Sequence, residues 1–193
     1  MDKKNLNLPN FISACRLVSV PVMLFCVFSG RETPFTWLLL AALLSDIVDG
    51  VIARVFHLCT KLGAFLDSAA DMGTYASAVA GIFMFRIDFV KLYWPALTMI
   101  FGFYILEKIS SFISYRMAFN AFHTYLSKIT AYVQGAFVMS LFLFGFKAFL
   151  FYPAMVICIV ANIEEMILAR LLPKYATDVK GLYWVLKKKP VGV

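Results

Sequence analysis

The sequence predicts an all-α integral membrane protein with six transmembrane helices and an N-terminal interfacial helical segment. Of the 193 residues, 62% are hydrophobic and only 15% are charged, whereas about 25% of the residues in an average soluble domain are charged. The apolar residues gather in six runs, each near the ~20 residues that cross a bilayer as a helix. No polar stretch is long enough to build a separate soluble core. We therefore expect residues 1–193 to form a single membrane domain.

The N-terminal segment predicts a helix that starts near Asn7-Leu8-Pro9-Asn10, because Pro9 is tolerated in a first turn and Asn10 can cap it. Arg16 follows among apolar neighbours, which favours a segment along the membrane interface that then turns inward. Pro21 predicts a kink where that segment enters the first span. The segment lacks the short apolar run and small-residue cleavage site of a signal peptide, so we expect it to be retained.

The hydrophobic runs place the six spans at residues 13–29, 35–57, 64–85, 89–114, 127–146 and 149–172. Turn residues and charges mark the breaks, as in SGRETP at 29–34 and HLCTKLG at 57–63. The break near Phe146 is short and predicts a tightly turned or re-entrant hairpin. The C-terminal sequence GLYWVLKKKPVGV mixes aromatic residues with lysines, which predicts a segment at the membrane surface.

The net charge of +7 is unevenly distributed. Six spans place both termini on one side of the membrane together with most lysines and arginines, whereas Arg31, Arg86, Lys91 and Lys147 fall on the other side. By the positive-inside rule the first side is cytoplasmic. We therefore expect a multi-pass protein of the cytoplasmic membrane with both termini in the cytoplasm. The basic side fits anionic lipid headgroups. Since its charges flank apolar segments, we expect no nucleic-acid partner.

Four aspartates lie within residues 46–71, namely Asp46, Asp49, Asp67 and Asp71. A carboxylate in or near a bilayer is costly unless it is paired or bound to a cation. On helices, the i,i+3 and i,i+4 spacings put each pair on one face, and the short connection makes the two helices antiparallel neighbours. All four carboxylates can then converge at one depth, near the cytoplasm. Hard oxygen ligands favour Mg²⁺, Mn²⁺ or Ca²⁺, and four carboxylates can hold two such ions, as in phosphoryl transfer.

Three further residues extend this pattern towards a substrate. Gly50 and Gly63 remove side chains beside the aspartates and permit close approach of a flat or bulky ligand. Arg54 offers a fork of donors for phosphate oxygens. The set indicates a phosphoanhydride substrate with one carboxylate left over as a base. Taken singly, each glycine also fits helix packing.

The pattern resembles a known signature. Asp46-Ile-Val-Asp49-Gly50-Val-Ile-Ala53-Arg54, then eight residues, then Gly63-Ala-Phe-Leu-Asp67-Ser-Ala-Ala-Asp71 is similar at every fixed position to the CDP-alcohol phosphotransferase motif, D-x2-D-G-x2-A-R-x8-G-x3-D-x3-D. The resemblance implies transfer of a phosphoalcohol group from a CDP-alcohol, usually CDP-diacylglycerol, to a hydroxyl acceptor, with release of CMP. It also implies the six-helix layout, and the family often forms homodimers.

The resemblance further implies a role for each matching residue. The four aspartates would bind two divalent ions, Mg²⁺ or Mn²⁺, and Asp71 would also be the base that deprotonates the acceptor hydroxyl. The CDP pocket would be lined by Pro9, Asn10, Asp49, Gly50, Ala53, Arg54, Thr60 and Gly63.

The acceptor is predicted from two other stretches. NLPNFISACRLVSVP at 7–21 resembles the start of phosphatidylglycerophosphate synthases and implies glycerol 3-phosphate. Those enzymes usually carry Asp-Pro-Leu-Ala-Asp-Lys where this chain has Asp67-Ser-Ala-Ala-Asp71-Met. The serine resembles phosphatidylserine synthases, so serine, inositol phosphate and other alcohols remain alternatives. Arg116, His123 and Lys128 flank the connection between the fourth and fifth spans and would bind either an anionic acceptor headgroup or lipid phosphate.

Two other functions compete with this interpretation. A small divalent-cation transporter could use the carboxylates as a pathway, but the sequence shows no inverted repeat and Gly50 and Gly63 stay unexplained. A membrane prenyl-transfer enzyme also places aspartates on a diphosphate. That chemistry would require two separated aspartate-rich segments, and this chain offers one.

Overall fold

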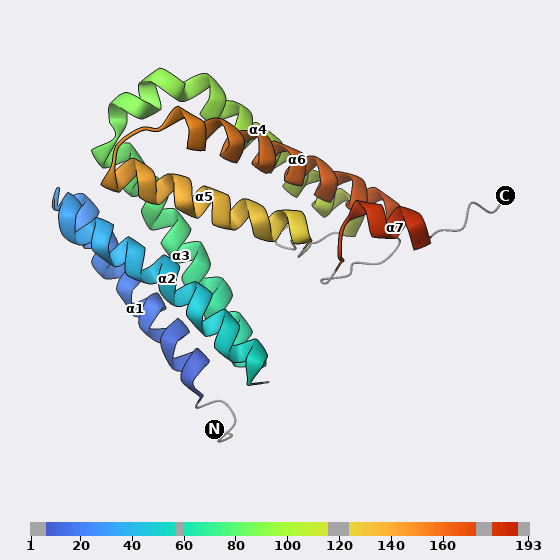
Figure 1. Ribbon diagram of the computed structural model, residues 1–193, viewed down its shortest axis with the longest axis horizontal. Coiled ribbons are helices and arrows are strands. Elements are labelled where there is room, and N and C mark those ends of the chain that lie inside the picture. The colour runs from blue at the N-terminus through green and yellow to red at the C-terminus, as the bar shows by residue number, and fades with distance from the viewer. Residues whose placement is uncertain (1–6, 57–59, 116–123, 173–178, 189–193) are drawn as a thin grey trace. The chain divides into compact units, whose positions relative to one another are not determined.

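The computed structural model describes residues 7–56, 60–115, 124–172 and 179–188, and within these ranges every regular element is a helix (Figure 1). The chain divides into two compact units, Met1–Leu92 and Tyr93–Val193, called here the N-terminal unit and the C-terminal unit. The all-α prediction is therefore confirmed for the described part of the chain.

The N-terminal unit is built from α1 (Leu8–Phe28), α2 (Glu32–Val55) and α3 (Lys61–Phe85). α1 packs along both α2 and α3, whereas α2 and α3 touch each other much less. Figure 1 shows α2 and α3 running in opposite directions beside α1, as the short connection between them predicts. The apolar core of this unit includes the fully buried Met23, Phe35, Leu39 and Ala70. α1 is thus the packing partner that α2 and α3 share.

The start of α1 differs from the prediction in two respects. Asn7, not Asn10, is the N-cap, because its side chain accepts a hydrogen bond of 3.0 Å from the Asn10 N–H. The helix then continues through Pro21 to Phe28, so the expected segment and the first span form one helix, and the position of its start at the membrane interface stays a prediction. Arg16 does not need the interface, because it is buried at 3% exposure and is ion-paired inside the N-terminal unit.

The C-terminal unit contains most of α4 (Ile87–Tyr115), together with α5 (Tyr125–Leu143), α6 (Ala148–Leu171) and the short α7 (Leu182–Lys188). α4 is kinked at Tyr93, whose φ of −107° and ψ of 16° are not helical, and Pro95 follows within the helix. α5 and α6 pack together, and Gly145, at a φ of 75°, lies in the short turn that joins them. A tight turn at this break was predicted and is confirmed.

Four helical segments of the described residues are long and apolar enough to cross a membrane: Leu8–Phe28, Glu32–Ile52, Ile87–Ser114 and Tyr125–Leu143. α3 and α6 lie where the third and sixth spans were expected, but they are not among these four. The length and apolar composition of these helices identify the chain as a membrane protein. The number of six spans and the cytoplasmic position of both termini stay predictions.

The close packing of α1 on α3 leads to a test at Gly73. A Cβ added there would lie 2.6 Å from Val20 Cγ2, and a branched valine cannot rotate both of its methyl groups away. We expect Gly73→Ala to cost about 1–3 kcal/mol through overpacking and to lower the melting temperature of the purified protein in detergent.

Gly102 in α4 is the matched control, because nothing lies within 4 Å of an added Cβ there. Gly102→Ala should leave the melting temperature unchanged or raise it, since alanine favours a helix over glycine by about 1 kcal/mol. Equal melting temperatures for the two variants would contradict the described α1–α3 contact.

Candidate metal centre

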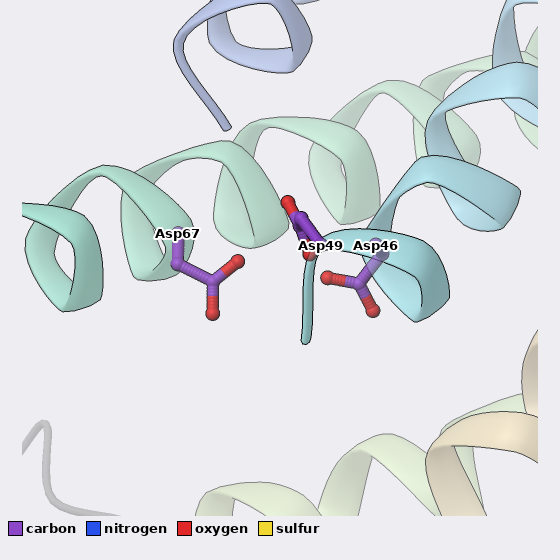
Figure 2. A group of neighbouring side chains, drawn as sticks. All are labelled: Asp46, Asp49 and Asp67. Atoms are coloured by element: carbon purple, nitrogen blue, oxygen red, sulfur yellow. The ribbon is translucent and has the colours of Figure 1, made fainter. Parts of the chain in front are cut away.

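Three of the four predicted aspartates form a compact group on facing helices. Asp46 and Asp49 come from α2 and Asp67 from α3, and one carboxylate oxygen from each lies within 4.8 Å of the others. Figure 2 shows the carboxylates of Asp46 and Asp67 directed towards the space between the two helices, with Asp49 between them in this view. The i,i+3 spacing puts both α2 aspartates on one side of that helix. Asp71 follows Asp67 by one turn of α3.

The guanidinium of Arg16, from α1, lies among all four carboxylates. Its Nη1 donates to Asp46 Oδ1 and its Nη2 donates to Asp67 Oδ1. Nη2 also lies 3.3 Å from Asp71 Oδ1 and 3.8 Å from Asp49 Oδ2. Only 1% of the Arg16 side chain is exposed, and a buried charge is tolerated only when it is paired. Sequence reasoning assigned Arg16 to the membrane interface and missed it as the centre of this site.

Arg16 belongs to a polar stripe on α1 that includes Asn10 and Ser13, all three of which are buried. Ser13 Oγ lies 3.1 Å from Asp49 Oδ2 and 3.2 Å from the Pro9 carbonyl oxygen. Asp49, itself only 3% exposed, is therefore satisfied from α1 as a buried carboxylate must be. Polar residues at helical spacing in an otherwise apolar span were the signal in the sequence that could have located this face.

The stripe ends in a contact between the starts of α1 and α3. Asn10 Nδ2 donates a hydrogen bond of 3.0 Å to Thr60 Oγ1, which accepts another of 2.9 Å from the Gly63 N–H as the N-cap of α3. A Cβ on Gly63 would lie 2.2 Å from Asn10 Oδ1. The absence of a side chain at Gly63 is therefore what permits this approach.

The remaining residues predicted for nucleotide binding are described in part. Pro9 is buried in the first turn of α1, and Gly50 is half-buried beside Asp49 on α2. Ala53 and Arg54 belong to α2, but their side chains fall outside the described set.

The residues predicted to bind the acceptor all follow Leu92 in the sequence, whereas the four aspartates belong to the N-terminal unit. Arg116 and His123 lie outside the described residues. Lys128 is exposed in the first turn of α5, which belongs to the C-terminal unit.

The donor set fits a hard divalent cation. All the candidate ligand atoms are carboxylate oxygens, which Mg²⁺, Mn²⁺ and Ca²⁺ prefer. Oxygens on opposite sides of such an ion lie about 4–5 Å apart, and the Asp46, Asp49 and Asp67 oxygens lie within 4.8 Å of one another. The cluster can therefore hold a metal ion without large movement of α2 or α3.

Comparison with known proteins gives one family. The family model described as CDP-alcohol phosphatidyltransferase matches residues 6–169, which include the whole of the described N-terminal unit. No solved structure gives a significant match.

Curated relatives match over part of their length. A protein of Mycobacterium tuberculosis named as a probable phosphatidylglycerophosphate synthase is 37% identical over 84 residues, which are 40% of this chain and 40% of the relative. The CDP-diacylglycerol–inositol 3-phosphatidyltransferase of Saccharomyces cerevisiae is 35% identical over 40% of this chain and 33% of the relative. The CDP-diacylglycerol–glycerol-3-phosphate 3-phosphatidyltransferase of Aquifex aeolicus is 35% identical over 34% of this chain and 37% of the relative.

The contact between Asn10 and Gly63 can be tested with a double-mutant cycle. Gly63→Ala places its Cβ against Asn10 Oδ1, so we expect a loss of stability of about 1–3 kcal/mol from overpacking. In an Asn10→Ala background that oxygen is absent, so the same glycine substitution should cost much less. Thermal unfolding of the four proteins measures the coupling. Additive losses would show that the two residues do not constrain each other.

Proposed function

Because the chain belongs to the CDP-alcohol phosphatidyltransferase family, we propose that it transfers a phosphatidyl group from CDP-diacylglycerol to a hydroxyl acceptor and releases CMP. The observation that carries this proposal is the convergence of the signature aspartates from α2 and α3 around one buried position. The diacylglycerol part of CDP-diacylglycerol is a lipid, which fits a site that includes α1 and α2, two helices long and apolar enough to cross a membrane.

We assign Asp46, Asp49, Asp67 and Asp71 as ligands of two Mg²⁺ or Mn²⁺ ions, which when bound neutralise the diphosphate and make CMP a better leaving group. The site has a closed side and an open side. The Asp49 side chain is 4% exposed and hydrogen-bonded to Ser13, whereas the Asp71 side chain is 54% exposed.

This difference in exposure supports Asp71 as the base. A base must meet the acceptor hydroxyl, and Asp71 has the most exposed side chain of the four. An Asp71 carboxylate oxygen takes the hydroxyl proton, and the acceptor oxygen attacks the phosphorus that bears diacylglycerol. The bond from that phosphorus to the CMP oxygen breaks, so CMP leaves with the electron pair.

The nucleotide is proposed to lie along the junction of α1, α2 and α3. Four of the assigned residues, Pro9, Asn10, Thr60 and Gly63, lie at or beside the contact between the starts of α1 and α3. The other four lie on α2: Asp49, Gly50, Ala53 and Arg54. Arg54 is assigned to the phosphate oxygens, which its fork can bind in pairs.

Glycerol 3-phosphate is the proposed acceptor, with serine, inositol phosphate and other alcohols as alternatives. Relatives named for glycerol 3-phosphate and for inositol both occur among the matches. Arg116, His123 and Lys128 supply basic groups for an anionic headgroup.

We further propose that the protein lies in the cytoplasmic membrane with six spans, both termini and the active site facing the cytoplasm. The uneven distribution of the net charge of +7 supports this orientation. Residues 1–193 would then act as one domain, and two copies would form a homodimer.

The base assignment predicts that Asp71→Asn lowers the rate of CMP release by at least about a hundredfold, the usual contribution of a general base. Release of CMP from CDP-diacylglycerol by the purified protein measures it. Asp88→Asn, an exposed aspartate in the first turn of α4, is the matched control and should retain the rate. Full activity in Asp71→Asn would show that another group takes the proton.

The acceptor is identified by a screen with CDP-diacylglycerol and Mn²⁺ or Mg²⁺. We expect CMP release with glycerol 3-phosphate and much less with serine, inositol or inositol phosphate. Release only with another alcohol would overturn the acceptor and keep the reaction. No release with any alcohol would count against the reaction itself.

A further inference from the structure

Arg16 contacts the same carboxylates that the proposed function assigns to metal. Its two Nη atoms donate to Asp46 Oδ1 and Asp67 Oδ1, and both residues belong to the group of three that can hold one ion. The contact therefore links α2 to α3 through a cation carried on α1.

We propose that Arg16 is a tethered counter-ion that competes with the divalent ions for these oxygens and holds the site together when no ion is bound. The proposal rests on the metal-binding part of the proposed function. It adds that ion binding at this site is an exchange, in which a divalent ion displaces the guanidinium from Asp46 and Asp67.

A bound ion and the guanidinium of Arg16 would occupy the same small space. One oxygen from each of Asp46, Asp49 and Asp67 lies within 4.8 Å of the other two, so an ion bound to all three must lie in the small space that they enclose. The guanidinium donates to two of these residues from within hydrogen-bonding distance. Two cations this close inside a partly buried site repel each other strongly. The guanidinium and the ion therefore exclude each other.

The acidic residues around Arg16 can carry more charge than one guanidinium balances. Four carboxylates lie within 4.0 Å of Arg16 and offer four negative charges, whereas the guanidinium supplies one positive charge. When all four are ionised, three negative charges stay unbalanced (four minus one). A divalent cation compensates more of that charge than Arg16 does, and this difference favours ion binding. Without either cation the carboxylates would repel one another.

The guanidinium of Arg16 is held in place by the carboxylates. Its Nε is buried and has no hydrogen-bond partner among the described residues, so the guanidinium is fixed by its Nη contacts with the carboxylates. Loss of these contacts to an ion would leave only the flexible side-chain stem between the guanidinium and α1. The side chain is thus anchored strongly by the site and weakly by its own helix, as an exchangeable counter-ion must be.

Arg16 also contributes to the assembly of the three helices of the N-terminal unit. α2 and α3 make few direct contacts, and each packs mainly on α1. Their acidic faces would repel each other in the absence of a cation. Arg16 supplies that cation from α1, so the ligand set is held in place before an ion arrives.

Binding of Mn²⁺ to the purified full chain tests the proposal, with free Mn²⁺ followed by its EPR signal. Arg16→Gln keeps a polar side chain of similar length and removes the charge. We expect its Kd for Mn²⁺ to fall about tenfold or more, because the guanidinium no longer competes with the ion. A change of this size is within the usual range for coupling between two groups that bind the same protein. Arg86→Gln is the matched control, since Arg86 pairs with Glu32 in the same unit and away from the aspartates. Its Kd should equal that of the wild type.

Thermal unfolding provides a second measurement that does not depend on activity. Arg16→Gln should have a lower melting temperature than the wild type without added metal, because four carboxylates have lost their counter-ion. Added Mn²⁺ should raise its melting temperature by more than it raises that of the wild type, since tighter binding to the folded state stabilises it further.

The outcomes separate this proposal from the proposed function. A Kd for Arg16→Gln equal to or above the wild-type value, with Mn²⁺ bound by both, overturns the exchange and leaves the metal site intact. Binding that persists unchanged in Asp46→Asn, or no binding by the wild type, overturns the metal site as well. If Arg16→Gln does not fold, the Kd of Arg16→Lys for Mn²⁺ is measured in its place. Its point charge cannot bridge two carboxylates as a guanidinium does, so a lower Kd supports the exchange and an equal or higher Kd overturns it.

Discussion

The burial of one guanidinium among four carboxylates is the constraint on which the N-terminal unit depends. Arg16 has 1% of its side chain exposed, and it pairs with residues from both α2 and α3. Neither the cation nor the buried Asp49 could be placed between apolar helices alone, since an unpaired charge there costs several kcal/mol. The position of α1 against its two neighbours is therefore tied to the position of the acidic residues.

The buried polar face of α1 contains two more side chains that bond to the same site. Asn10, Ser13 and Arg16 are all buried on the face that meets the site, and they bond in turn to Thr60, Asp49 and the other aspartates. Apolar side chains give helices in a membrane little preference for one another over lipid, so small residues and hydrogen bonds set the pairing. Gly63 provides the close approach of α3 to the start of α1, and Gly73 provides it farther along.

The sequence was sufficient to predict that the aspartates converge, because the spacing of Asp46 to Asp49 and of Asp67 to Asp71 fixes two helix faces and the short connection fixes their direction. Arg16 was missed because hydropathy treats a lone cation near a helix end as interfacial. Its partners lie at least 30 positions away along the chain, so only the packing of α1 identifies them. Thr60 shows a similar limit, since a position that the family resemblance assigns to the nucleotide is also the N-cap of α3.

The gradient of exposure across the carboxylates gives the site a direction. Asp49 faces α1, is 4% exposed and takes a hydrogen bond from Ser13, so its orientation is set by the fold. Asp71 lies at the other extreme, at 54% exposure, one turn beyond Asp67 on the same helix. A side chain that binds a metal ion must keep its geometry and benefits from a buried, hydrogen-bonded position such as that of Asp49. A base must meet an incoming hydroxyl and requires an exposed position such as that of Asp71. Residues of one type thus supply both environments: Asp49, one turn beyond Asp46 on α2, bonds to Ser13 of α1, whereas Asp71, one turn beyond Asp67 on α3, has the more exposed side chain.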